Sequence, residues 1–159
     1  MEIILVDIGS STVKVYKYSN GKLSLMLQRT LYFKEGFDPE NGISQKNKKE
    51  LFELLEKVKE ENKDIPIRLY AIGIFRKLNP ETKVNFIDEV FLRTGLYFNI
   101  IDQDLENFYL EMALVGKCNL NEPLPCCAIA QAICEKYNIE KIIPSDSNII
   151  NGIVRQEFN

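Results

Sequence analysis

Histidine is absent from the 159-residue sequence, and this absence excludes several kinds of active site. Without an imidazole the chain has no Ser-His triad, no His-ligated zinc and no histidine general base. Any acid–base chemistry must therefore come from other groups, and a carboxylate is the natural replacement.

Cysteine is scarce, and its four residues, Cys118, Cys126, Cys127 and Cys134, lie late and close together. Their spacing is not that of a paired CxxC metal framework, and we expect reduced, mostly buried thiols. Long apolar runs that would span a membrane are also missing, as is the basic-then-apolar start of a signal peptide. We therefore expect a cytoplasmic protein with no membrane partner.

An excess of positive charge is lacking as well, because the formal net charge is -3 at pH 7. This balance argues against a broad nucleic-acid-binding surface, which is usually basic. It does not exclude a small phosphorylated ligand, since one loop can bind that locally. The length is that of about one domain, with enough residues for a sizeable core.

The apolar pattern predicts an α/β protein. Strands are predicted over residues 3–7, 13–18, 23–33, 67–74 and 97–101, and helices over 45–62, 80–93 and from Asp102 or Asp104 to about 115. An Asn20-Gly21 turn joins the second and third strands. The later alternation of strand and helix favours parallel pairing, after an antiparallel meander.

Local signals set the ends and inner faces of these predicted helices. Ser44 is a candidate N-cap, and Gly95 is a natural stop. Apolar residues are expected to face the core at Leu51, Phe52, Leu54, Leu55 and Val58 of the first helix, and at Phe86, Ile87, Val90 and Phe91 of the second. Further along, a helix over 126–137 and a strand over 141–143 are predicted, and 148–158 is ambiguous between helix and loop.

Three features at predicted strand ends suggest a phosphate site. Gly9, Ser10, Ser11 and Thr12 follow the first strand, and successive N–H groups in a glycine-containing turn can bind an anion. Asp7 just before them could hold a hydrated divalent cation. The alternative is a simple hairpin turn made of small residues.

Arg76 and Glu106 follow the later strands. A guanidinium at the carboxyl end of a strand could grip phosphate oxygens, whereas the alternative is a surface arginine. Glu106 could activate water as a general base, or could simply favour the start of its helix. Together with the loop and Asp7, these groups suit attack of water on a phosphoryl group, because such catalysis is mostly positioning and charge stabilisation.

Four stretches resemble a known family. Asp7 to Lys14 is similar to the first phosphate motif of the actin-like ATPase superfamily. "YAIGIFRKLN", "TGLYFNIIDQDLENFYLEMALVG" and "AICEKYNIEKIIPSDSNIINGIV" resemble, in order, segments of its exopolyphosphatase / guanosine pentaphosphate phosphatase family. The resemblance implies an actin-like (ribonuclease H-like) lobe of order βββαβαβα, a mixed sheet with helices on both faces, followed by a helix–strand remnant of a second lobe.

The resemblance also assigns roles. It implies that Gly9, Ser10, Ser11 and Thr12 bind phosphate, together with Lys14 and Arg76. It implies that Asp7 holds Mg²⁺ and that Glu106 orients or deprotonates water. The implied reaction removes a terminal phosphate from polyphosphate or guanosine pentaphosphate.

The chain also departs from the family pattern. Ile72 replaces a threonine, Asp102-Gln103 replaces Ser-Gly, Leu105 replaces one glutamate and Phe108 replaces an arginine. The second phosphate motif, Asp-x-Gly-Gly-Gly-Ser, is absent after Gly116, where KCNLNEPLP follows. We therefore expect a first lobe over 1–117, a junction over 118–125 and a remnant of the second lobe over 126–159.

Two alternatives to a hydrolase stay open. One is a module that binds phosphate or nucleotide without turnover, which the missing second motif favours. The other is a structural lobe that self-associates, as a homodimer, through the surface its partner lobe would cover. Kinase chemistry occurs in the superfamily, but the sequence shows no adenosine-binding signature.

Overall fold

The computed structural model describes residues 1–114 and 148–158. The predicted helix over 126–137, the predicted strand over 141–143, the junction over 118–125 and the cysteines lie outside these residues. None of the helices within the described residues is long and apolar enough to cross a membrane.

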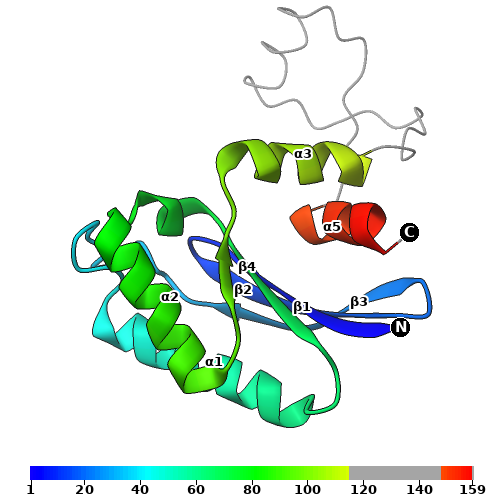
Figure 1. Cartoon of the computed structure of the whole chain (residues 1–159), viewed down its shortest axis with the longest axis horizontal. Coiled ribbons are helices and arrows are strands. Elements are labelled where there is room, and N and C mark those ends of the chain that lie inside the picture. The colour runs from blue at the N-terminus through cyan, green and yellow to red at the C-terminus, as the bar shows by residue number, and fades with distance from the viewer. Residues whose placement is uncertain (115–147, 159) are drawn as a thin grey trace, which may run out of the picture.

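In the described part of the chain, a mixed sheet forms the centre of the fold, with helices on both faces (Figure 1). Its strands are β1 (Glu2–Ile8), β2 (Thr12–Ser19), β3 (Lys22–Thr30), β4 (Ile67–Ala71) and β5 (Phe98–Ile100), in the order β3-β2-β1-β4-β5. β1 pairs antiparallel with β2, and β2 with β3, whereas β4 pairs parallel with both β1 and β5. The predicted antiparallel meander leading into parallel strands is therefore confirmed.

The β2–β3 hairpin turns where predicted but its second strand is shorter. Asn20 and Gly21 both have positive φ, 51° and 75°, as a tight two-residue turn requires. The prediction that this strand continues to Phe33 is wrong, because β3 ends at Thr30. Thr30 pairs with Thr12, the first residue of β2, so no partner strand remains beyond it. The next apolar residues, Leu31 and Phe33, enter the core instead.

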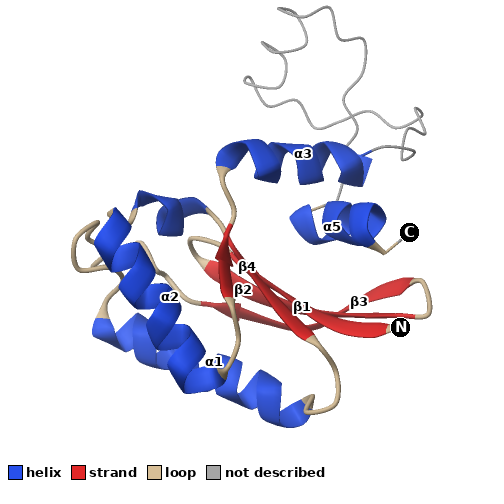
Figure 2. Cartoon of the chain, in the orientation of Figure 1, coloured by secondary structure: helices blue, strands red, loops and turns tan. Residues whose placement is uncertain are grey.

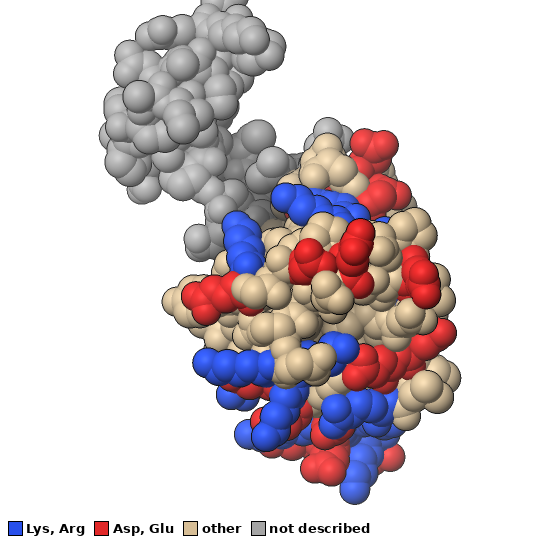
Figure 3. Space-filling model, turned by 90° about the vertical axis from the view of Figure 1, so that its left-hand side faces the viewer, with Lys and Arg blue, Asp and Glu red and all other residues tan. Residues whose placement is uncertain are grey.

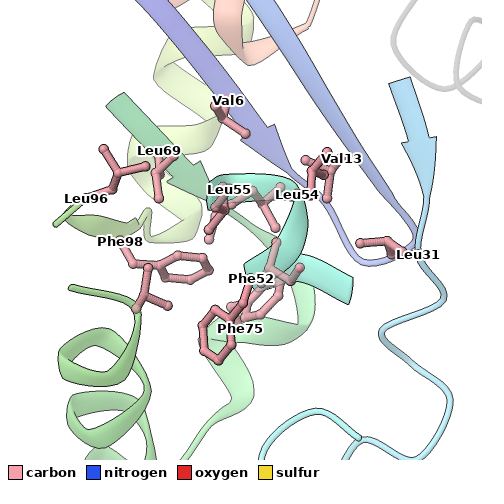
Figure 4. Packing of buried hydrophobic residues seen from close by; sticks show 14 of the residues in the cluster. Val6, Val13, Leu31, Phe52, Leu54, Leu55, Leu69, Phe75, Leu96 and Phe98 are labelled. Carbon is pink, nitrogen blue, oxygen red and sulfur yellow. The ribbon is translucent and has the colours of Figure 1, made fainter. Parts of the chain in front are cut away.

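Helices α1 (Gln45–Glu61) and α2 (Pro80–Thr94) cover one face of the sheet (Figure 2). The Ser44 side chain accepts from the Asn47 N–H and caps α1 as predicted, while Gly95 ends α2 with φ of 68°. Figure 4 shows the core beneath them, where Phe52 and Leu55 of α1 lie close to Phe75 and Phe98. All five core positions predicted on α1 are buried. On α2 the inward prediction is wrong for Phe91, whose side chain is exposed.

The predicted strand over 67–74 is wrong in its second half. β4 stops at Ala71, the partner of Ile8 at the end of β1, and a short 3-10 helix, η1 (Gly73–Lys77), follows. Gly73 turns the chain with φ of 69°. The apolar residues that continue the strand pattern, Ile74 and Phe75, are buried from η1 instead.

The other face of the sheet carries α3 (Gln103–Leu114) and α5 (Ile149–Glu157), which lie side by side. The ambiguous segment 148–158 is thus largely helical, and Asn148 caps it with a capping box. Ile149, Ile150 and Ile153 pack on Leu5 and its neighbours in the sheet. The described end of the chain therefore packs against the same sheet as the N-terminal strands.

Candidate active site

The loop between β1 and β2 is a closed turn, and two N–H donors at its tip have no acceptor among the described residues. The Gly9 N–H donates to the Thr12 carbonyl over 2.9 Å, and the Ser11 carbonyl accepts from the Leu31 N–H over 3.0 Å. Within the described part of the chain, no hydrogen bond joins the backbone N–H of Ser10 or Ser11 to an acceptor. Two successive free N–H groups are the donors that an anion-binding loop uses.

The fold itself makes no demand for glycine at position 9. A Cβ there would meet the Thr12 carbonyl oxygen at 3.5 Å and the Thr12 Oγ1 atom at 3.8 Å, which are ordinary contacts, and φ is not positive. The missing side chain therefore leaves room beside the loop that no described residue uses. Close approach of a ligand to the backbone is one reason for a glycine at such a position.

Ser10 ties this loop to η1. Its Oγ accepts from the Ile74 N–H over 3.2 Å, which leaves the hydroxyl hydrogen free to donate. Gly73 lies so close that a Cβ there would overlap the Ser10 side chain. The loop and the 3-10 helix that carries Arg76 are therefore positioned by one another.

Arg76 and Glu106 are in direct contact. The Arg76 Nη1 group donates to Glu106 Oε2 and, over 3.3 Å, to the Ile101 carbonyl, and Nη2 donates to Gln103 Oε1 over 2.8 Å. The Arg76 and Glu106 side chains are only 23% and 15% exposed. The structure thus brings together two residues that lie 30 positions apart in the sequence.

The start of α3 holds Glu106 in place. The Asp102 side chain accepts from the Leu105 N–H over 2.8 Å, and its carbonyl accepts from the Glu106 N–H over 3.1 Å. Asp102, rather than the alternative Asp104, therefore caps the helix. Glu106 lies in the first turn, where the helix dipole favours a negative charge.

Asp7 lies near the end of β1 on the face that α3 and α5 cover. Its Oδ1 atom is buried and has no hydrogen-bond partner among the described residues. Burial raises the pKa of Asp7 to about 6, the charge of Lys14 opposes this rise, and the charge of Glu106 adds to it. Lys14 is the pairing partner of Asp7 across β1 and β2. All the predicted site residues therefore belong to one end of the sheet.

Some polar residues here escaped the sequence analysis. Asn148, the cap of α5, donates from Nδ2 to the Tyr16 hydroxyl over 2.8 Å. Burial raises the pKa of Tyr16, and the charge of Asp7 raises it further. Gln103 binds Arg76. Asn148 carried a detectable signal, an Asn ahead of an apolar helical face, but Gln103 and Tyr16 carried none, because their partners are distant in the sequence.

A hollow of about 370 Å³ is lined by residues of β4, β5, α3 and α5 and by none of the predicted site residues. Its polar lining residues are Arg68, Tyr70, Asn99, Tyr109 and Glu157. Glu157 contacts both Arg68 and Tyr109, and Asn99 donates to the Leu69 carbonyl, so most of these groups are already paired within the protein. Figure 3 views another face, on the left of Figure 1, where basic and acidic side chains are interspersed.

Solved structures share this fold, although no protein-family model matches the sequence and no curated protein matches it. The PPX-GPPA enzyme of Aquifex aeolicus is 23% identical over 72% of this chain and 40% of that one, with a TM-score of 0.55. An exopolyphosphatase from Cytophaga hutchinsonii is 14% identical over 72% and 38% of the two chains, with a TM-score of 0.60. A type II variant of the Aquifex aeolicus Ppx/GppA phosphatase is 22% identical over 76% and 42%, at 0.56.

These likenesses confirm the predicted fold, a lobe of the actin-like kind found in the Ppx/GppA phosphatases. The chain spans only about two fifths of the length of the structures it matches, 38–42%.

Proposed function

We propose that this lobe binds the terminal phosphates of a phosphoric anhydride, polyphosphate or guanosine pentaphosphate, and acts as an exopolyphosphatase-related phosphohydrolase. One observation carries the proposal. The β1–β2 loop, η1 and the start of α3 place free N–H groups, a guanidinium and a carboxylate at the same end of the sheet. Phosphoryl transfer to water needs these groups, because it depends on positioning and charge stabilisation.

The binding roles follow from the chemistry of each group. The N–H groups of Ser10 and Ser11 and the Ser10 hydroxyl would donate to phosphate oxygens, and Gly9 would let the backbone come close. Arg76 would add a charged fork, which suits two oxygens of one phosphate. Lys14, beside Asp7, would add a second positive charge at the loop.

Asp7 fits a hydrated Mg²⁺ ion. Its buried Oδ1 has no partner among the described residues, and a cation would supply one. Mg²⁺ usually keeps several waters and uses one or two carboxylates together with substrate phosphates, so a single aspartate is enough. When bound, the ion would neutralise charge on the phosphoryl group.

Glu106 would act on the attacking water. The water oxygen forms a bond to the terminal phosphorus, the bond from that phosphorus to the bridging oxygen breaks, and a water proton passes to the Glu106 carboxylate. The products are orthophosphate and an anhydride shorter by one phosphate. In the present structure Arg76 is paired with Glu106. To bind the phosphate, the guanidinium must direct some of its N–H groups toward the phosphate oxygens.

A binding module without turnover is the second candidate, and the same ion pair favours it. The Glu106 Oε2 atom already accepts from Arg76, which leaves the carboxylate less open to a water molecule. The absence of the second phosphate motif from the sequence also favours this candidate. With only one phosphate-binding loop, the departing phosphate chain has fewer contacts to stabilise it during the reaction.

Phosphate release tests both candidates. Purified protein with Mg²⁺ would be given tripolyphosphate, longer polyphosphate and guanosine pentaphosphate, and binding of each would be measured by calorimetry. A hydrolase releases phosphate, and Glu106→Gln abolishes release but retains binding. Glu60→Gln, at an exposed position of α1, is the matched control and should behave as wild type. Binding without release favours the second candidate, and absence of both rejects the proposal.

A further inference from the structure

The Arg76 guanidinium has three of its five N–H groups occupied. Nη1 donates to the Ile101 carbonyl and to Glu106, and Nη2 donates once, to Gln103. The two that remain are Nε–H and the second Nη2 N–H, and no described residue accepts from them. Both can donate to oxygens of a phosphate that approaches the guanidinium.

Gln103 determines how many N–H groups of Arg76 Nη2 remain available to a ligand. Its Oε1 accepts from Arg76 Nη2 over 2.8 Å, and its Nε2 donates to Asn107 Oδ1 over 3.1 Å. The second bond fixes the orientation of the amide, because a flipped amide would present its nitrogen to the guanidinium. The other two acceptors both bind Nη1, so without Gln103 the guanidinium is held at one nitrogen and can pivot about it.

This contact is a departure from the resembled pattern. The Ser-Gly of that pattern is Asp102-Gln103 in this chain, and a glycine has no side chain to offer an acceptor. Asp102 takes over the cap of α3, and Gln103, the first residue of the helix, is thereby placed over Arg76. The substitution therefore adds a contact to the site.

We propose that Gln103 is a positioning residue for Arg76. By occupying one Nη2 N–H, it holds the guanidinium in one orientation and leaves Nε–H and the second Nη2 N–H to donate to a phosphate. It also keeps Arg76 in place when a bound phosphate competes with Glu106 for the guanidinium. This role in anion binding rests on the proposed function, whereas the hold on Arg76 does not.

The test replaces Gln103 with methionine, which has a similar length and helix propensity but no hydrogen-bond acceptor of comparable strength. Gln45→Met is the matched control, because Gln45 is also the first residue of a helix, α1, and is exposed. Gln103→Glu retains an acceptor oxygen and serves as the conservative variant. Urea unfolding of all three shows that they remain folded.

The first measurement is the Nε–H signal of Arg76 by NMR, recorded without ligand. We expect Gln103→Met to increase side-chain motion and Nε–H exchange, and Gln103→Glu and Gln45→Met to leave both as in wild type. An Arg76 signal that is the same in Gln103→Met overturns the proposal. This measurement stands even if wild-type protein binds no phosphate, an outcome that would reject the proposed function alone.

The second measurement is tripolyphosphate affinity and turnover. We expect Gln103→Met to raise Kd and KM about fivefold to tenfold, which corresponds to the loss of one ordinary hydrogen bond, with kcat within about twofold. A merely structural role would lower the amount of active protein and leave KM unchanged. A fall in kcat with KM unchanged, or no change in either constant, overturns the proposal.

Discussion

Replacing Asp7 with asparagine should stabilise the fold at neutral pH while removing the proposed metal ligand. The substitution keeps the shape of the side chain and removes its charge. In wild type that charge is costly, because Oδ1 is buried without a partner among the described residues and burial raises the pKa of Asp7. A stabilising change at a site residue is the signature of a group retained for function.

The magnitude follows from the pKa of Asp7, which is 3.8 for an unperturbed aspartate and about 6 in the fold. At about 1.4 kcal/mol per pKa unit, the ionised carboxylate costs about 3 kcal/mol of unfolding free energy. A raised pKa means that the folded state holds the proton more tightly. The contribution of Asp7 to stability is therefore fully present below pH 3.8 and is lost as the pH rises through about 6.

Urea unfolding at several pH values between 4 and 8 measures this difference. Asp7→Asn and wild type should be similar near pH 4, diverge through pH 5 and 6, and differ by about 3 kcal/mol above that range. Asp64→Asn, at an exposed position, is the control and should show no such divergence. A second set of unfolding measurements adds magnesium. A ligand at ten times its Kd raises the unfolding free energy by about 1.4 kcal/mol, and only wild type, which retains Asp7, should show this increase.

Two results would refute the reasoning. If the difference between Asp7→Asn and wild type is independent of pH, the carboxylate is not desolvated in the folded protein. If wild type is the more stable of the two at pH 7.5 without magnesium, the charge has a partner inside the protein and is not held ready for a cation.

Glycine positions give the remaining predictions. Gly9→Ala should leave the urea midpoint close to that of wild type, because a Cβ fits there, but should weaken tripolyphosphate binding in calorimetry. Gly73→Ala should lower the unfolding free energy by about 1–3 kcal/mol, because φ is positive and the new Cβ would overlap Ser10. Equal stability of Gly73→Ala and Gly9→Ala would contradict this. Gly152→Ala should cost about 3 kcal/mol in the same assay, because its Cβ would overlap the Tyr109 carbonyl and push α5 away from α3. Wild-type stability of Gly152→Ala would show that the two helices do not pack this closely.

Much of the fold was predictable because its signals are local. The Asn20-Gly21 turn, the Ser44 cap and the Gly95 stop each depend on neighbouring residues only. Strand ends were less predictable. β3 and β4 stop where their partner strands stop, at Thr12 and Ile8, although the apolar pattern continues beyond both.

The candidate site also has a part that could be predicted from the sequence and a part that could not. Its residue types could be located at the ends of predicted strands, since parallel strands bring their carboxyl ends to one edge. Their contacts could not be predicted. The pairing of Arg76 with Glu106 depends on how η1 meets the start of α3, and the hold of Gln103 on Arg76 depends on a side chain with no sequence signal of its own.

The sequence by itself determined the element order, the turn chemistry and the set of groups suited to phosphate, because backbone propensity and side-chain type act over a few residues. Only the tertiary structure decided that the Asp7 Oδ1 atom is buried without a described partner, and that α5 packs on the sheet beside α3. It also decided that the candidate base, Glu106, is held by the candidate phosphate ligand, Arg76. Burial and pairing are properties of residues far apart in the chain, and they exist only once the sheet and both helical layers have assembled.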